Sequence, residues 1–557
     1  MTRYRLLVFA LLVIILVLAL GSVRLDSTTS DETEHIGCGV IKILHGQLEF
    51  FRFQPPLWDA VLAAPMVLDG VRVPPLRSPL TTSPWAIGRY VLYNTGHDAH
   101  RLLLLARLPT VAAFLALCLA VYLFVARQTG SRRWGVAALV LTGFCPLLMA
   151  HGRLATVDIA ATLFMFLGVT LLLRLIERPS IPAAIFLGLA SSAAVLSKSS
   201  GSILGPLFLL LIVVAFALRR IAEPRRFLRL FALSALAGLV FAEIVILSMA
   251  SPTYIRSNFP RLDSPVKRLA LPVAEGLANV RAINKYYSGG HDFPQFLLGR
   301  YGYAGWLHYY PTAILLKTTL PALMLALVGM IAMVRRLPRR DAGMEGSPSQ
   351  SRFAALVCFV FTGAYLLLSL RSALAIGARS VLPMYPFIYS GAIIAIAEAW
   401  RDIAVHRRRI AGIVFVALLT WHAAENLVAY PGYIAYFNQF AGGKANADRL
   451  LIDSNLDWGQ DLRRLAIWSR ENGVREMTIH YFGGSDVLWE MKGIRTHLLK
   501  GPGSAPLPQG WFAVSRHFYR LSLGRQVWPD DYETYLRANR ARYVTTVGDS
   551  ILVYRIP

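Results

Sequence analysis

The sequence predicts an α-helical membrane protein that crosses the bilayer about eleven times and carries a small α/β domain outside the cytoplasm. Of its 557 residues, 55% are hydrophobic and only 16% are charged, which is too little charge for a soluble chain of this length. Eleven apolar runs approach or exceed the roughly 17 residues that a membrane-spanning helix needs. Beyond residue 428 the pattern changes to short alternating runs.

The eleven runs form the predicted transmembrane part, residues 1–428. They cover approximately residues 5–21, 101–126, 134–150, 155–174, 182–197, 201–218, 227–249, 311–334, 354–370, 381–400 and 410–428. The first run could instead be a cleaved signal peptide, because the small residues Ala19 and Gly21 lie near its end. Cleavage would change the number of helices but not the side on which the next loop lies.

Arginines predict the direction of the chain. If the N-terminus is cytoplasmic, every predicted inner loop is basic, from Arg3 and Arg5 to the cluster at 401–409, as the positive-inside rule requires. The long segments 22–100, 251–310 and 429–557 then lie outside. The formal charge of +25 reflects topology and anionic lipid head groups rather than nucleic acid, because the basic residues form no single patch. Arginine outnumbers lysine, which suggests a GC-rich bacterial genome and nothing more. The expected location is a bacterial cytoplasmic (inner) membrane.

The tail 429–557 is predicted to fold as the small extracytoplasmic α/β domain. Strand-like runs occur at 477–482, 511–515 and 543–547, and a helix is expected over 461–473. In the first outer loop, a helix is expected over 36–46, and the apolar run 56–68 is too short to span and should lie in the interface. Three of the four cysteines fall inside apolar runs, so no disulfide framework is predicted.

Acidic and basic residues gather at the predicted outer ends of the helices. They are Asp31, Glu32, Asp158, Lys198, Lys317 and Arg379. Ionisable groups are costly within a membrane, so their convergence on one side indicates a shared site. Lysine and arginine can hold the phosphate of a lipid-linked substrate, and a carboxylate can take a proton from an attacking hydroxyl. The pattern therefore predicts transfer of a group from a lipid phosphate to an acceptor.

Several motifs resemble one known family. DETEH (31–35) resembles the acidic first-loop motif of lipid-carrier-dependent glycosyltransferases of family 39, the protein O-mannosyltransferase and aminoarabinose-transferase type, which have the GT-C fold. FQPPL (53–57) and SKSSG (197–201) are similar to that family's proline-pair element and lysine-containing turn. GARSVLPMYPF (377–387) and DSNLDWGQDL (453–462) resemble stretches of bacterial members. The resemblance covers nearly the whole chain in order and spacing.

The resemblance implies an inverting glycosyltransferase that moves a monosaccharide from a polyprenyl-phosphate carrier to an acceptor outside the cell. Asp31 would be the catalytic base, Glu32 would orient it or contact the acceptor, and Asp158 would be a second acid. Lys198, Arg379 and Lys317 would contact the carrier phosphate. Weaker expected contacts to acceptor or sugar are His35, Gln54, His291, Asp453, Asn455, Asp457 and Trp458.

Two departures from the family pattern leave alternatives open. Gln54 stands where the family usually has histidine or lysine, so the phosphate or metal contact expected there is in doubt. His35 lies four residues after Asp31 instead of three, and an alignment on that histidine would make Glu32 the base. We predict Asp31, because the ungapped DET match favours it.

The sequence names neither the sugar nor the acceptor, which could be protein, lipid or polysaccharide. A divalent metal is a candidate cofactor, although no diagnostic ligand spacing is present. His97, Asp98 and His100 could bind a metal, but a solvated turn before the second helix is the better interpretation. An alternative function is a transporter or flippase for a lipid-linked or anionic substrate, which should carry charges near the midplane and show repeated halves. A third is an assembly factor whose outer domain binds glycan.

Overall fold

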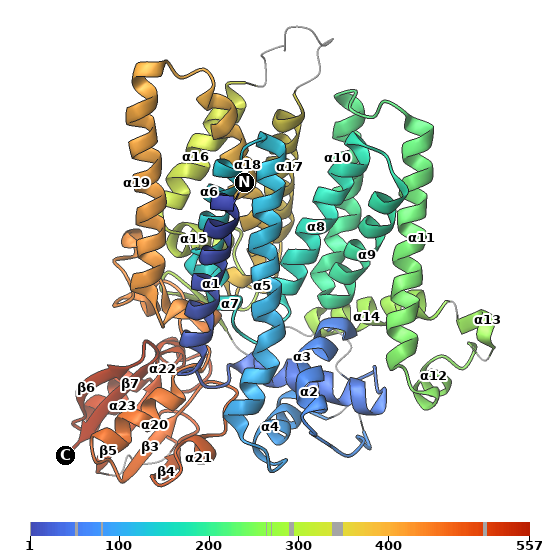
Figure 1. Cartoon of the computed structure of the whole chain (residues 1–557). Coiled ribbons are helices and arrows are strands. Elements are labelled where there is room, and N and C mark those ends of the chain that lie inside the picture. The colour runs from blue at the N-terminus through green and yellow to red at the C-terminus, as the bar shows by residue number, and fades with distance from the viewer. Residues whose placement is uncertain are drawn as a thin grey trace.

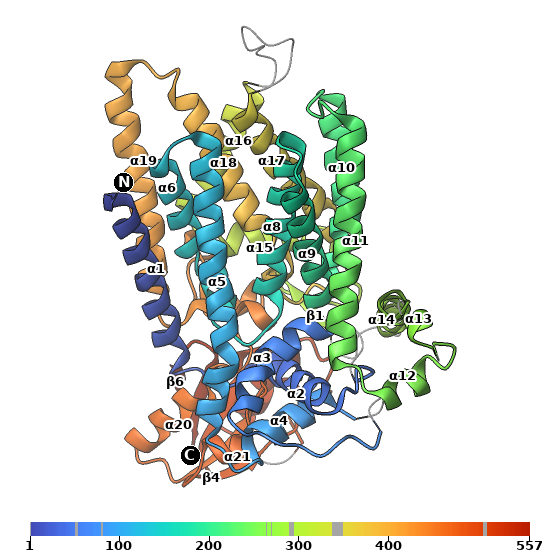
Figure 2. The ribbon, with the colours of Figure 1, turned by 45° about the vertical axis from the view of Figure 1, so that its right-hand side comes forward.

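Long helices stand side by side, and a small sheet and several short helices gather at one of their ends (Figure 1). The computed structural model describes residues 2–50, 54–78, 82–262, 264–268, 270–288, 294–336, 349–504 and 509–557. Figure 2 shows that the short helices α2 (Ser30–His45), α3 (Pro56–Leu68) and α4 (Pro84–Tyr93) lie at the same end as the sheet.

The helical body contains all eleven predicted apolar runs. Its elements are α1 (Thr2–Val23), α5 (Ala99–Thr129), α6 (Arg132–Gly143), α7 (Pro146–His151), α8 (Asp158–Glu177), α9 (Ile181–Ser197), η1 (Ser199–Ile203), α10 (Leu204–Ala217), α11 (Pro224–Met249), α15 (Tyr309–Lys317), α16 (Leu320–Val334), α17 (Gln350–Ser369), α18 (Met384–Trp400) and α19 (Val405–Ala429).

Fewer than eleven helices of the described ranges count as full spans by length and composition alone. Within the described ranges, seven helices are long and apolar enough to cross a membrane, and up to eight if the pair α15 and α16, bent by 115°, counts as one span. The run 134–150 is split into α6 and α7, with Pro146 in the first turn of α7, where proline is tolerated because its missing N–H has no helical partner. Helices α9 and α18 have only 17 residues each.

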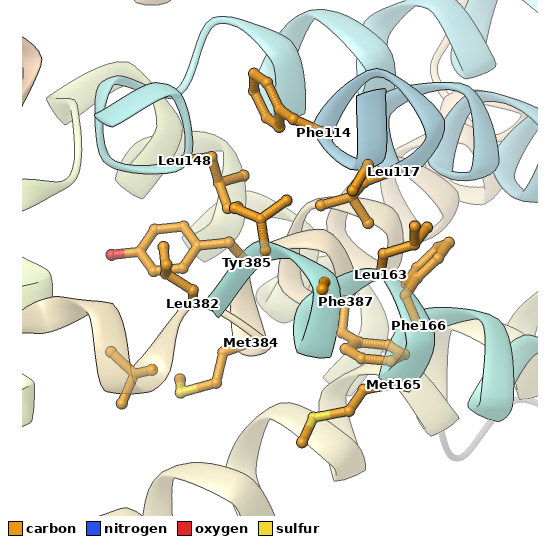
Figure 3. Packing of buried hydrophobic residues seen from close by; sticks show 14 of the residues in the cluster. Phe114, Leu117, Leu148, Leu163, Met165, Phe166, Leu382, Met384, Tyr385 and Phe387 are labelled. Atoms are coloured by element: carbon orange, nitrogen blue, oxygen red, sulfur yellow. The ribbon is translucent and has the colours of Figure 1, made fainter. Parts of the chain in front are cut away.

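One hydrophobic core joins the central helices. Figure 3 shows side chains of α5, α7, α8 and the start of α18 converging on it. Phe387 lies 3.9 Å from Phe361 and 5.1 Å from Phe166 between ring centroids. This packing fixes the first residue of α8 and the turn η2 (Ala378–Val381) before α18, and both carry site residues.

The predicted helix at 36–46 is longer and begins earlier. Helix α2 starts at Ser30, because Thr29 and Glu32 form a capping box in which the Thr29 N–H donates to Glu32 Oε2 at 2.9 Å. Its glycines allow close approach: a Cβ on Gly39 would lie 2.0 Å from the Asp59 carbonyl oxygen of α3. The remaining short elements of the outer segments are α12 (Pro252–Asn258), α13 (Pro265–Arg268), α14 (Leu271–Ser288), β1 (Gln295–Leu297) and β2 (Arg300–Gly302).

The tail contains a five-stranded sheet in the order β4-β3-β5-β7-β6. Strand β3 (Glu476–His480) pairs in parallel with β4 (Arg495–Leu498) and β5 (Gly510–Ser515). Strand β7 (Ile551–Ile556) pairs antiparallel with β5 and with β6 (Arg542–Val547). The associated helices are α20 (Leu462–Glu471), α21 (Val487–Glu490), α22 (Arg516–Ser522) and α23 (Tyr532–Ala538). The three strand-like runs singled out in the sequence are strands, and β4 and β7 are additional.

The segment between α19 and the sheet packs against both the helical body and the tail, where its Asp448 forms ion pairs with Arg516 and Arg520 of α22. It contains the short turns η3 (Tyr433–Ala435), η4 (Gln439–Ala441), η5 (Ala447–Arg449) and η6 (Asp453–Asn455). Tyr433, Leu456 and Trp458 belong to the same hydrophobic cluster as the membrane helices, whereas the sheet has its own clusters. The predicted domain boundary, between residues 428 and 429, lies at the end of α19.

Candidate active site

An arginine joins two of the predicted acids. Arg379 in η2 lies 2.7 Å from Oδ2 of Asp31, in the first turn of α2, and 3.8 Å from Oδ2 of Asp158, the first residue of α8. Asp158 is almost fully buried, whereas the Asp31 side chain keeps 20% of its surface exposed. Of these two carboxylates, Asp31 is thus the one that solvent can reach.

Lys198 extends this row of charges. Its Nζ lies 2.6 Å from Oδ1 of Asp158, and its side chain is 23% exposed. The backbone of Lys198 is extended and ends α9. Four segments therefore contribute one alternating row, Asp31–Arg379–Asp158–Lys198. The structure brings together these four of the six main predicted residues.

An aromatic ring supports the guanidinium. Arg379 lies over the ring of Trp458, with 4.5 Å between Cζ and the ring centroid, a cation–π contact. The edge of His151 contacts the same tryptophan at 5.7 Å. Trp458 is buried, so its ring supports one face of the Arg379 guanidinium.

Asp453 also faces this cluster. Burial raises the pKa of Asp453 to about 7, with a contribution from Asp31, while Arg379 and the Ser454 N–H act in the opposite direction. Asp453 has φ +60°, in the left-handed region that non-glycine residues seldom adopt. Its N–H donates to His517 Nδ1 at 3.2 Å, and its Oδ1 accepts from the Ser454 N–H at 2.6 Å.

Glu32 is held by other groups. Arg107 donates to both of its oxygens at 2.7 Å, and the N–H groups of Thr29 and Ala155 donate at 2.9 and 2.8 Å. Burial acts to raise the pKa of Glu32, but Arg107 and these donors hold it below its usual value. A fully bonded carboxylate is poorly suited to accept an acceptor's proton. Glu32 therefore fastens the start of α2, the helix that carries Asp31, to α5 and to the chain before α8.

His35 and Gln54 lie beside a second buried cluster. His35 Nδ1 is 2.9 Å from Oδ1 of Asp59, whose Oδ2 accepts from Lys42 Nζ at 2.9 Å. Lys42 Nζ also donates to the Gln54 carbonyl oxygen at 2.9 Å. Burial alone lowers the pKa of His35, but its bond to Asp59 and that carboxylate's charge raise it to about 9. Sequence reasoning missed Lys42 and Asp59, although the spacing of seven between His35 and Lys42 places both on one helix face.

Lys317 points to backbone oxygens rather than to the row of charges. Its Nζ donates to the carbonyl oxygens of Ile434 at 2.7 Å and Asn455 at 2.6 Å and lies 4.3 Å from the centroid of Phe437. The Asn455 side chain in turn accepts from the Ala378 N–H at 2.9 Å. Lys317 thus fastens the segment before the sheet to α15, and Asn455 fastens it to η2.

Asp457 likewise binds backbone groups rather than the row of charges. Its oxygens accept from the N–H groups of Gly459 at 3.2 Å and His517 at 3.1 Å.

His291 lies outside the described residues. Asp98 caps α5 by accepting from the Arg101 N–H at 2.7 Å, so His97 and Asp98 precede this helix and His100 lies in its first turn. Within the described part of the chain, no group of three or more His, Cys, Asp or Glu side chains could hold a metal ion, and the metal stays a prediction.

An apolar groove of about 690 Å³ reaches the lysine turn. Its walls come from α9, α10, α11 and α14, and Ser199 and Ser202 line it directly after Lys198. A second apolar groove, of about 630 Å³, lies between α3, α5, α8, α9 and α11.

Comparison with known proteins identifies the fold. Residues 100–245 match the family model of dolichyl-phosphate-mannose-protein mannosyltransferase. The whole chain superposes on ArnT from Cupriavidus metallidurans in the apo state with a TM-score of 0.50 and 13% sequence identity, covering 99% of this chain and 98% of that chain. The chain has the GT-C fold of ArnT. Both the predicted helical membrane class and the predicted resemblance are confirmed.

Two further structures are similar at lower scores. ArnT from the same organism bound to undecaprenyl phosphate gives a TM-score of 0.47 at 12% identity, over 99% of this chain and 98% of that one. The arabinofuranosyltransferase AftD from Mycobacteria gives 0.41 at 12% identity, over 99% of this chain and 40% of AftD. No curated protein matches the sequence. The region matched by the family model contains Asp158, Lys198 and Arg107, and thus part of the charged row and the partner of Glu32.

Proposed function

We propose that this protein is an inverting glycosyltransferase that moves a monosaccharide from a polyprenyl-phosphate carrier to an acceptor on the outer face of the membrane. The observation that carries the proposal is the row Asp31–Arg379–Asp158–Lys198. It puts the partly exposed Arg379 beside the partly exposed Asp31 and connects Arg379 to Lys198 through the buried Asp158. The matched family description, a transferase that uses a lipid-phosphate sugar, supports the same chemistry.

Lys198 and Arg379 would hold the donor phosphate. Both contact Asp158, so a phosphate beside that residue meets two cations at once. When the bond between the anomeric carbon and the phosphate oxygen breaks, its electron pair stays on the phosphate. Fixed cations stabilise charge that develops in this way, and charge-assisted hydrogen bonds to phosphate are among the strongest in proteins.

The prenyl chain would lie in the apolar groove that begins at Ser199. This groove offers about 690 Å³ lined by residues such as Leu204, Phe208 and Leu239. Because Lys198 directly precedes Ser199, a phosphate on Lys198 lies at the groove's polar end. The lipid could then enter sideways from the membrane, with its sugar directed toward Asp31.

Asp31 would take the proton of the attacking hydroxyl. Without donor, Arg379 neutralises this carboxylate across 2.7 Å. A donor phosphate competes for the same guanidinium, so donor binding weakens the ion pair and frees Asp31 to act as a base. Attack on the face opposite the phosphate inverts the anomeric carbon.

A deletion strain tests the proposal. We expect an accumulated polyprenyl-phosphate sugar and a missing sugar on one envelope component, both detected by mass spectrometry of lipids, glycans and exported proteins. Expression of the Asp31→Asn variant should restore protein but not the modification. A flippase predicts a different result: purified protein in liposomes would move the lipid-linked sugar between leaflets without breaking the sugar–phosphate bond, and that outcome would overturn the proposal.

A further inference from the structure

A second carboxyl lies next to Asp31 and has no role in the scheme above. Glu34 is three residues further along α2, and residues at this spacing are neighbours on a helix surface, with Cβ atoms about 5–6 Å apart. The Glu34 side chain is only 4% exposed. Its Oε1 is buried and has no hydrogen-bond partner among the described residues.

The charged groups around Glu34 come from three elements. Asp31 and His35 lie on its own helix, Asp59 on α3 and Arg379 in η2. His35 is committed to Asp59 at 2.9 Å and Arg379 to Asp31 at 2.7 Å. Neither cation therefore forms an ion pair with Glu34 in the described structure.

Two structural explanations for Glu34 do not apply. The capping position of α2 is filled by Glu32, which accepts from Thr29. The ion pairs found among the described residues do not include Glu34, whereas Asp59, equally buried, has two cationic partners. An unpartnered buried carboxyl is costly, and such groups in folded proteins call for a functional explanation.

We propose that Glu34 receives the proton that Asp31 takes from the acceptor. The inference rests on the proposed glycosyl transfer. The acceptor oxygen bonds to the anomeric carbon while the carbon–phosphate oxygen bond breaks, and the electron pair leaves with the phosphate. The hydroxyl proton passes to the Asp31 carboxylate and then to the Glu34 carboxylate, which becomes neutral. Glu34 releases this proton to water before the next cycle.

The electrostatics of Glu34 suit a proton acceptor. Burial raises its pKa to about 8, the Asp31 and Asp59 charges act in the same direction, and His35 and Arg379 oppose the rise. A carboxylate with a higher pKa is a stronger base, and general bases work best when their pKa lies near the working pH. Asp31 touches the substrate in this scheme, and Glu34 acts through it.

The pH dependence of transfer tests this role. Because Glu34 must be unprotonated to accept the proton, kcat of the wild-type protein should rise with pH with a midpoint near 8. Glu34→Gln should lose this rise and lower kcat by about 100-fold, with KM for the donor unchanged. Glu34→Asp should keep a rise at a shifted midpoint. Glu490→Gln, which removes another buried carboxyl with a pKa raised to about 7, should leave the profile unchanged.

An infrared titration of the wild-type protein tests the inference even if the variants fold poorly. In wild-type protein the infrared band of one protonated carboxyl should disappear as pH rises through about 8, and Glu34→Gln should remove it. If Glu34→Gln keeps both the kcat and the midpoint of wild type, or if the band persists in it, the inference is wrong while the proposed transfer stands. If the wild-type protein shows no transfer, or Asp31→Asn stays fully active, the proposed function itself fails.

Discussion

The guanidinium of Arg379 lies 2.7 Å from the carboxylate of Asp31, although Arg379 belongs to the turn η2 before α18 and Asp31 to the first turn of α2. This pair makes the segment after α1 and the second half of the helical body parts of one candidate site. It also places the expected base in direct competition with the expected phosphate for the same cation. The predictions below follow from this arrangement and from the groups that hold it.

Replacing Asp31 by asparagine should lower kcat by about 100- to 10,000-fold, because the amide cannot accept the acceptor's proton. Donor binding should persist or strengthen, since Arg379 loses its competing carboxylate. Single-turnover transfer and equilibrium binding of a polyprenyl-phosphate sugar measure the two effects separately. Asp69→Asn, at an ion pair with Arg101, is the control. Unchanged transfer in Asp31→Asn would remove this residue from the chemistry.

Replacing Arg379 by lysine should raise KM for the donor at least tenfold, even though the charge is kept. Lysine cannot offer the planar fork that binds phosphate at two points and lies flat on Trp458. Donor titrations in detergent measure the change. Trp458→Phe should have a smaller effect on KM, because phenylalanine keeps a ring under the cation. A lysine variant with wild-type KM would show that the phosphate lies elsewhere.

Removing the charge of Glu32 should destabilise the fold. Glu32→Gln leaves Arg107 buried without its carboxylate, and breaking a buried pair costs about 3–5 kcal/mol. Thermal unfolding of the purified protein should show a clearly lower midpoint. Glu476→Gln removes an exposed partner of His497 and should leave the midpoint almost unchanged. Equal midpoints for the two variants would contradict the structural role of Glu32 at the start of α2.

Filling the apolar groove should raise KM only for donors with a long prenyl chain. Ala235→Trp places a large ring on the wall of the groove that reaches Ser199, so KM should rise for a donor with a long prenyl chain and stay constant for a short-chain analogue. Leu209→Trp, at a 63% exposed position of α10, should change neither value. If both donors respond alike to Ala235→Trp, the prenyl chain does not use this groove.

The sequence located the chemistry at one end of the helices more reliably than it described individual contacts. Asp31, Asp158, Lys198 and Arg379 could be predicted to meet, because each follows or precedes an apolar run on the same side. Hydropathy does not reveal that the run 134–150 is interrupted before Pro146, or that α15 and α16 are bent against each other. It therefore does not show that fewer than eleven of the described helices count as full spans by length and composition.

Partners that lie far apart in the chain were not visible. Arg107 binds Glu32 from α5, and no local spacing relates the two residues. Lys317 has the charge of a phosphate ligand, but its Nζ donates to the carbonyl oxygens of Ile434 and Asn455. A buried ammonium needs hydrogen-bond acceptors. Which acceptors lie nearest to it depends on how the helices pack, and local sequence does not show this.

Trp458 and Asp453 belong to the stretch of chain that leads into the sheet, and Lys317 fastens that stretch to the helices. Residues 453–458 are thus part of the candidate site, and they connect the helices to the tail. A homologue that exchanged its terminal module for another would have to rebuild the surface under its own arginine. Proteolysis within residues 433–458 should abolish turnover even if every membrane helix survived.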